Sequence, residues 1–507
     1  MRCALAQDRG EICFFEVVVM HRDMTIDMCS GPLLGKLLRF SVPLMLSGIL
    51  QLLFNAADIL VVGQFTGSQA MAAVGSTGSL NNLIINIFLG LSAGGSVVVA
   101  QYYGMRAWND VGEVVHTAIL LGAVSGTALV FIGFVLARPV LALMGTTADV
   151  IDQSVLYMRI VFAGMPAMMV YDFGAGILRA VGDTKRPLIY LFIGGVVNVG
   201  FNLFFVIVCN LGVAGVAIGT VMSQCIAAVL TIRCLLKTDA PYRLQLRELR
   251  IVKAKLFRIL HVGIPTGISG AMFSISNVLI QSSINSFDSS IIVAGNTASG
   301  NIEGFVYNGM NAFYQAALTF TGQNTGAHKP KRVLSILLWC LLSVTVIGLV
   351  LGGIVVIFGH QLLAIYNPDP EVIAYGFERL QIIALTYFLC GVMDVVTGSI
   401  RGLGPSVTPT VISLTGICLL RIVWIYTIFA VRHDLFTLYL SYPVSWIITF
   451  AANIACFAFF SAGGRKGGEA LPSTKKNAKK SPCGSDARQW DLYFDFRRPA
   501  HAGKAAA

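Results

Sequence analysis

The sequence predicts an all-α membrane protein with twelve transmembrane helices, arranged as two six-helix lobes that are related by an internal parallel repeat. Three observations lead to this prediction. Of the 507 residues, 56% are apolar and 12% are charged, and the mean hydropathy is +0.75, so there are too few charges to cover soluble domains. Continuous apolar runs of about 20 residues recur, as bilayer-spanning helices require, whereas a β-barrel shows short alternating segments. The third observation is a repeat at a fixed offset.

The repeat is most visible in two arginine motifs. RAVGDTKRP at 179–187 recurs as RGLGPSVTP at 401–409, with Arg, Gly and Pro at the same spacing and an offset of 222 residues, from 179 to 401. The same offset pairs Pro43 with Pro265, Gln101 with Gln323, Gly104 with Gly326, and Asp172 with Asp394. Agreement at one offset along so much of the chain indicates a duplicated unit. Because six spans is an even number, both halves enter the membrane from the same side, and their axis lies along the membrane normal.

Each half contains six apolar runs. Those of the first half are 37–63, 69–104, 112–138, 152–180, 185–209 and 213–236. Those of the second half are 256–286, 291–322, 333–358, 371–402, 406–430 and 435–460. The spans 69–104 and 291–322 are rich in Gly, Ser and Asn, so we expect them to pack inside the protein. The predicted N-lobe is therefore 33–240, followed by a basic linker at 241–255 and a C-lobe at 256–460.

We expect both ends of the chain to lie outside the lobes. Residues 1–32 carry an apolar patch, CFFEVVVM, that is far too short to span a bilayer, and we expect a disordered N-terminal tail. The natural start is left open between Met1, Met24 and Met28. Residues 461–507 are rich in Gly, Lys, Ser and Pro, which predicts a disordered basic C-terminal tail.

The basic residues predict the orientation. Short loops on one side carry Arg106, Arg179, Lys185, Arg186, Arg233 through Arg258, Lys329, Lys331, Arg332 and Arg401, whereas the opposite loops carry Arg138 and Arg432. Positive loops remain inside, so both termini should be cytoplasmic in a multi-pass protein of the cell (inner) membrane. The positive-inside rule thus accounts for the net charge of +11, and we expect no nucleic-acid partner. The eleven cysteines are scattered singly, and we expect no cofactor and no metal other than Na⁺.

The first span contains a carboxylate, Asp58, within FSVPLMLSGILQLLFNAADILVVG at 40–63. A carboxylate in hydrocarbon costs at least about 2.5 kcal/mol on insertion scales and normally faces a partner or a wet cavity. Helix rise places Asn198, Asn202 and Thr220 in the same layer, roughly 8 to 18 Å below the outer helix ends. Asn198 and Asn202 are four residues apart and share a helix face. Together the four residues could supply hard oxygen ligands for Na⁺, or a cage in which Asp58 binds a proton.

A structural role for these residues is the alternative. Asp58 could be a buried carboxylate that holds helices together, and Asn198 and Asn202 could be interhelical contacts, worth roughly 0.6 kcal/mol each. The repeat mate of Asp58 is Ile280, so this acid breaks the symmetry between the two lobes.

Several motifs together resemble one transporter family. They are residues 40–63 with the following QFTG and AMAAVG, the pair AQYYG and GQNTGA, and the pair ILRAVGDTKRP and SIRGLGPSVTP. Over about residues 33–460 the chain is similar to the multidrug and toxic compound extrusion (MATE) transporters. The resemblance implies a two-lobed secondary antiporter that exports mostly cationic, amphipathic compounds in exchange for Na⁺ or H⁺. It also implies a first-lobe cation site whose first-helix Asp, fifth-helix pair and sixth-helix Thr match Asp58, Asn198, Asn202 and Thr220. Some members carry an acid where this chain has Asn202, which leaves the coupling ion open.

The second lobe offers two further candidates, Asp394 and Glu303. The resemblance implies second-lobe acids on the tenth and seventh helices, but the 256–286 span contains no acid. A structural alternative is that Asp394 pairs with Arg401 two turns later, as its repeat mate Asp172 would pair with Arg179. Glu303 has no basic residue nearby in its span.

The sequence therefore favours a monomeric secondary antiporter for organic cations or drugs. The alternative is a lipid or oligosaccharide flippase of similar two-lobed architecture, which would need a cationic cavity for phosphates, whereas the acids favour cationic cargo. An intramembrane enzyme would need a clustered nucleophile and base or a metal set, and no such motif is present. The histidines do not cluster, because they lie in or near separate loops: His116, His261, His328 and His360.

Overall fold

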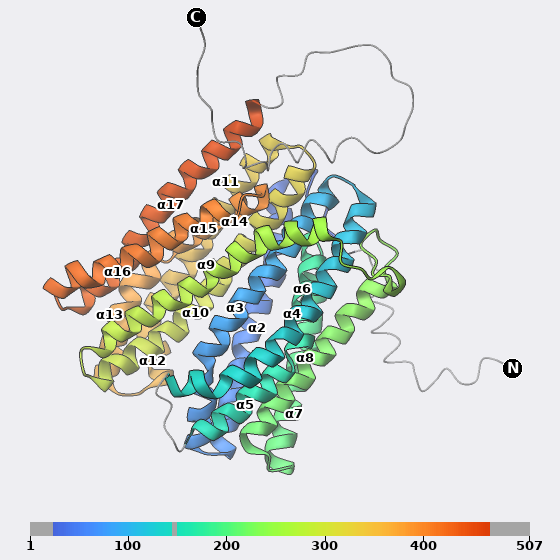
Figure 1. Ribbon diagram of the computed structural model, residues 1–507. Coiled ribbons are helices and arrows are strands. Elements are labelled where there is room, and N and C mark those ends of the chain that lie inside the picture. Colours follow the sequence, from blue (N-terminus) through green and yellow to red (C-terminus); the bar gives the residue numbers. More distant parts are fainter. Residues whose placement is uncertain (1–23, 144–149, 467–507) are drawn as a thin grey trace, which may run out of the picture. The chain divides into compact units, whose positions relative to one another are not determined.

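The structure is a computed structural model that describes residues 24–143 and 150–466 (Figure 1). The described residues up to Ala462 form one compact unit. Most of the two predicted tails, 1–23 and 467–507, lies outside the described residues.

The first half contains the helices predicted for the N-lobe. They are α2 (Leu33–Phe65), α3 (Ser68–Gly104), α4 (Trp108–Leu143), α5 (Ile151–Ala163), α6 (Met165–Ala180), α7 (Lys185–Leu203) with the π-helical turn η1 (Phe204–Val208), and α8 (Gly212–Lys237). The predicted span 152–180 is bent by 48° between α5 and α6. Gly164 lies at the bend and Pro166 follows it, and proline cannot continue the hydrogen-bond ladder of the preceding turn.

The second half repeats this order. It contains η2 (Leu246–Glu248), α9 (Lys253–Asn285), α10 (Ser290–Gly326), α11 (Pro330–Ile357), α12 (Gly359–Tyr366), α13 (Pro370–Thr386), α14 (Phe388–Leu403), α15 (Val407–Ser413), η3 (Leu414–Leu419), α16 (Leu420–Trp424), η4 (Ile425–Phe429) and α17 (Leu435–Lys466). The bend recurs between α13 and α14, at 42°. The π-helical turn η4 also lies within one residue of the repeat counterpart of η1.

Among the described residues, nine helices are long and apolar enough to cross a membrane, and the two bent pairs pass the same test as single spans. The one predicted span that does not pass this test is 291–322, which corresponds to α10 and whose Gly, Ser and Asn residues lower its hydropathy. It packs against α2, α3, α11, α13 and α14, so that protein surrounds it. The expectation that span 291–322 is packed inside the protein is confirmed.

The two lobes meet along helices that the repeat relates. The second helix of each lobe packs against the first helix of the other, α3 on α9 and α10 on α2. At the inner end, by which we mean the end that carries Ala180 and Gly402, the interface is closed by reciprocal hydrogen bonds. Gln101 Nε2 donates to the Gly402 carbonyl at 3.1 Å, and Gln323 Nε2 donates to the Ala180 carbonyl at 2.7 Å.

Two glycines allow this closure. A Cβ atom on Gly104 would lie 2.0 Å from the Gln323 carbonyl oxygen, and a Cβ on Gly326 would lie 2.0 Å from the Gln101 carbonyl oxygen. Real Cβ atoms do not approach so closely, so only glycine fits either position. The sequence pairs Gln101/Gln323 and Gly104/Gly326 therefore form one two-fold contact between the lobes.

We expect Gly104→Ala or Gly326→Ala to push the inner end open, because the added methyl meets backbone oxygen across the lobe interface. Overpacking of this kind costs about 1–3 kcal/mol. Cys29 is a native reporter, because its Sγ lies 3.8 Å from the Gln323 carbonyl oxygen and burial raises the pKa of its thiol, which slows alkylation. Maleimide labelling of Cys29, followed by mass spectrometry, should be faster in both variants.

Gly112→Ala is the matched control, since a Cβ at this position of α4 meets nothing within 4 Å. Its labelling rate should equal that of the wild type. Unchanged Cys29 labelling in both interface variants would show that this contact does not close the inner end.

The segment 24–32 differs from the prediction of a disordered tail. Met28 is fully buried in the core cluster that contains Phe40 and Phe320. The Ile26 amide donates to the Gly182 carbonyl at 3.3 Å, on the N-lobe side. On the C-lobe side, Arg332 donates to the carbonyl oxygens of Met28, Ser30 and Gly31. This part of the prediction is wrong, because side chains from a distant part of the chain bind the segment through its backbone.

Candidate cation site

The structure brings together the four residues predicted for the first-lobe site. Asp58 lies on α2, Asn198 and Asn202 on α7, and Thr220 on α8. Asn202 Nδ2 donates a hydrogen bond to Asp58 Oδ1, and Thr220 Oγ1 lies 3.4 Å from Asp58 Oδ2. Asn198 Nδ2 donates to Thr220 Oγ1 at 3.3 Å. One carboxylate therefore lies where three helices meet, and we call these four residues the Asp58 cage.

The Asp58 cage is buried and rich in oxygen acceptors. Asp58 is 9% exposed and Asn202 is fully buried. Asn202 Oδ1 has no hydrogen-bond partner among the described residues, although it is buried. It lies against α8, where a Cβ on Gly219 would be 2.2 Å away. An unpaired carbonyl oxygen beside a carboxylate is an arrangement that fits Na⁺ or a proton on Asp58.

Apolar side chains surround the outer part of the cage. Val61 and Val62 of α2 pack with Val206 of η1 and with Val213 and Val216 of α8. Such a layer lowers the local dielectric constant, so the charge of Asp58 interacts more strongly with a cation than it would in water. The same hydrogen bonds also join α2, α7 and α8, so the structural alternative for these residues stays open.

Glu303, a second-lobe candidate, lies in a buried ion pair. Arg379 of α13 donates from Nε to Glu303 Oε1 and from Nη2 to Oε2, both at 2.8 Å. Glu303 is 5% exposed and Arg379 is 8% exposed. Arg379 also donates to Asn296 Oδ1, and Asn296 Nδ2 donates to Gln281 at 3.0 Å. Because a bidentate guanidinium already neutralises its charge, Glu303 is a weaker candidate for coupling than Asp58.

The structural alternative predicted for Asp172 and Asp394 is a pairing with Arg179 and Arg401. No ion pair within 4 Å joins Asp172 to Arg179 or Asp394 to Arg401 among the residues that the structure describes. Arg401 donates instead to the Tyr314 hydroxyl and to Ser269 Oγ, each at 2.9 Å. Arg179 and Arg401 are nevertheless the opposite charges that act on Asp172 and Asp394, so the structural alternative stays a prediction. Asp394 stays a second-lobe candidate, and it makes no hydrogen bond to Glu303 in the described part of the chain.

The predicted site residues do not include two arginines, Arg379 and Arg421, although each lies inside a predicted span. The rule that makes an intramembrane Asp58 a functional candidate applies equally to a basic residue. Arg421 is 1% exposed and lies on α16.

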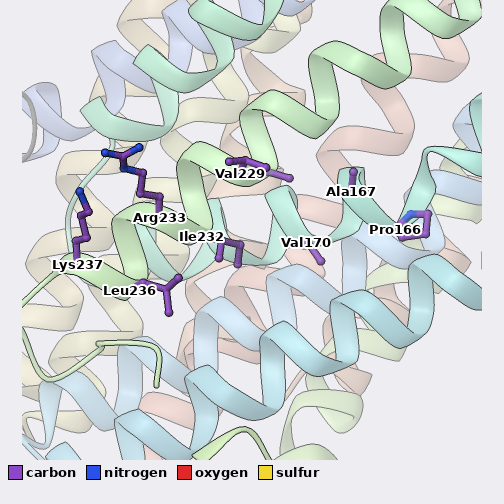
Figure 2. A pocket seen from close by; sticks show the side chains of 9 residues that line it. Pro166, Ala167, Val170, Val229, Ile232, Arg233, Leu236 and Lys237 are labelled. Carbon is purple, nitrogen blue, oxygen red and sulfur yellow. The ribbon is translucent and has the colours of Figure 1, made fainter. Parts of the chain in front are cut away.

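A surface groove of about 610 Å³ lies between α6 and α8 (Figure 2). Its walls are apolar, with Arg233 and Lys237 at one end and Pro166 at the other. On α8, its first lining residue is Ala228, about 12 Å further along the helix than Thr220. The groove is thus separate from the Asp58 cage, and its walls lack the oxygen ligands that a cation requires.

The sequence pattern of the MatE family matches this chain twice, at residues 43–204 and at 265–427. The chain belongs to the MatE family. The two matches start 222 residues apart, at 43 and 265, which is the offset of the internal repeat. The predicted two-lobed helical architecture is therefore confirmed for this MatE protein.

Two relatives from Bacillus subtilis (strain 168) are similar over most of their length. The probable multidrug resistance protein YoeA is 28% identical over 392 residues, which cover 75% of this chain and 83% of YoeA. The probable multidrug resistance protein YpnP is 28% identical over 398 residues, covering 78% and 88%. Among solved structures, a crystal structure of MATE in complex with MaL6 superposes with a TM-score of 0.82 at 20% identity, covering 88% of this chain and all of the other. That similarity supports the fold.

Proposed function

We propose that this MatE protein is a secondary active antiporter that exports small cationic, amphipathic molecules in exchange for Na⁺ or H⁺, with Asp58 as the coupling residue. The observation that carries the proposal is the buried Asp58 cage, in which a carboxylate and an unpaired amide oxygen lie where three helices of one lobe meet. The names of the Bacillus relatives, both probable multidrug resistance proteins, support the choice of cargo. The protein would act as a monomer in the cell (inner) membrane with both termini in the cytoplasm.

The coupling follows from differential binding. A cation in the Asp58 cage adds a bond among α2, α7 and α8, so it favours whichever lobe arrangement keeps those helices together. A substrate that binds the other arrangement better is then driven against its gradient. The flippase alternative has less support, because the relatives are named for drug resistance.

Proteoliposomes that contain the purified protein test this proposal. A fluorescent organic cation should move when a Na⁺ gradient or an H⁺ gradient is imposed, and applying each gradient separately identifies the coupling ion. Equal movement with and without both gradients would refute antiport. Movement of a labelled phospholipid in place of the organic cation would favour the flippase.

A further inference from the structure

The repeat locates the counterpart of the Asp58 cage in the second lobe. An offset of 222 residues relates α2 to α9, α7 to the helical segment 407–429, and α8 to α17. It places Ile280 at the position of Asp58 and Tyr442 at the position of Thr220. The acid is therefore absent from this second three-helix junction.

A buried arginine occupies the junction instead. Arg421 Nε donates to Ser445 Oγ of α17 at 3.1 Å, and Arg421 Nη1 lies 3.4 Å from Ser276 Oγ of α9. Its guanidinium carbon lies 4.2 Å from the centre of the Tyr442 ring. Arg421 thus joins the second-lobe counterparts of the three helices that Asp58 joins in the first lobe. One junction is centred on a negative charge and the other on a positive charge.

The charge of Arg421 has no carboxylate partner within 4 Å among the described residues. The acid Glu303 is neutralised by Arg379, whose guanidinium carbon lies 5.9 Å from the centre of the same Tyr442 ring. Asp394, the other second-lobe candidate, makes no ion pair with Arg421 among the described residues. Serine hydroxyls and the faces of Tyr442 and Trp446 therefore stabilise the guanidinium. A guanidinium keeps its proton in proteins, so this charge is permanent.

We propose that Arg421 is a positioning residue that acts as a tethered cation, filling the second-lobe counterpart of the coupling site. This inference rests on the proposed function. A second mobile cation would be repelled from this junction, so the transporter exchanges one coupling cation in each cycle, through Asp58. The second lobe keeps its three helices joined whether or not a coupling cation is bound.

Thermal stability of the purified protein tests the tethered cation without any transport. Arg421→Ala should lower the Tm, and guanidinium at low millimolar concentration should restore most of that loss. Arg421→Lys should keep more stability than Arg421→Met, because the lysine keeps the charge. Arg432→Ala, which removes an exposed arginine, should show neither the loss nor the rescue.

Two results would overturn the role as a cation. One is equal stability of Arg421→Lys and Arg421→Met. The other is a loss of wild-type stability when chloride is replaced by gluconate, which would mean that Arg421 holds an anion. Both results stay informative if the protein shows no coupled transport, so failure of the proposed function can be told apart from failure of this inference.

The number of ions per cycle separates a tethered cation from a merely structural arginine. The wild-type protein should exchange one Na⁺ or H⁺ per monovalent cationic substrate, so the exchange is electroneutral and an imposed membrane potential should not drive it in proteoliposomes, whereas an exchange of two ions moves net charge and should respond to the potential. Ile280→Asp should still exchange one, because the new acid pairs with Arg421. Ile280→Asp combined with Arg421→Met should exchange two, because the junction then resembles the Asp58 cage. Two ions in the wild type, or one in the combined variant when it is folded and active, would refute the proposal.

Discussion

Asp58→Asn should abolish ion-coupled transport while leaving the protein folded. An asparagine at this position can still accept the hydrogen bond from Asn202 and can donate to Thr220, so the geometry of the cage is kept. Only the charge is lost. A unit charge about 4 Å from a cation is worth about 4 kcal/mol at an effective dielectric constant of 20, which corresponds to about a thousandfold in cation affinity.

The measurement is uptake of the fluorescent cation under the gradient that drives the wild type. Asp152→Asn is the control, because Asp152 is exposed and forms a surface ion pair with Arg138 at 3.3 Å. The control should transport at the wild-type rate. Undiminished coupled uptake by Asp58→Asn would exclude Asp58 as the coupling residue.

Ligand-dependent stability distinguishes coupling from the structural alternative. If a cation binds the Asp58 cage, the coupling ion should raise the Tm of the wild type and leave that of Asp58→Asn unchanged, since a ligand stabilises only the state that binds it. If Asp58 only holds helices together, the substitution lowers the Tm equally with and without the ion.

The fold was predictable because two independent patterns agree. Apolar runs located each span, and the repeat required the same order in both halves. The apolar run is weakest in α10, whose Gly, Ser and Asn residues are buried against other helices, and there the repeat supports the assignment. The bend at Gly164 was not predicted, because the apolar run continues through it. The segment 24–32 was also missed, because its binding to Arg332 uses backbone carbonyls, which leave no pattern in the sequence.

The candidate site was only partly predictable, because helix rise gives depth but not the direction in which a side chain points. Depth was sufficient for Asp58, since its three partners share one layer and one lobe. Depth did not give the hydrogen bonds of Arg401, which donates to the Tyr314 hydroxyl rather than to Asp394. Depth also did not predict the partner of Glu303, because Arg379 is 76 residues away in the sequence. Pairing across helices depends on rotation about each helix axis, which hydropathy does not record.

Arg379→Met should destabilise the protein by about 3–5 kcal/mol, because it leaves the Glu303 carboxylate buried without its partner. Glu303 is 5% exposed, so water cannot readily replace the two hydrogen bonds from the guanidinium. The measurement is the free energy of unfolding, or the Tm, of the purified protein in detergent. Arg138→Met is the control, since it breaks an exposed pair worth about 0–1 kcal/mol.

Combining Arg379→Met with Glu303→Leu should restore most of this loss, because a buried ion pair can be replaced by apolar side chains of similar volume. A residual cost of about 1–3 kcal/mol should remain, since Asn296 Oδ1 loses the hydrogen bond from Arg379. Coupled transport by the double variant then decides the role of Glu303. Retained coupling means that the pair only holds α10 against α13. If a folded double variant loses coupling, Glu303 takes part in ion coupling, and residues of both lobes are then needed for it.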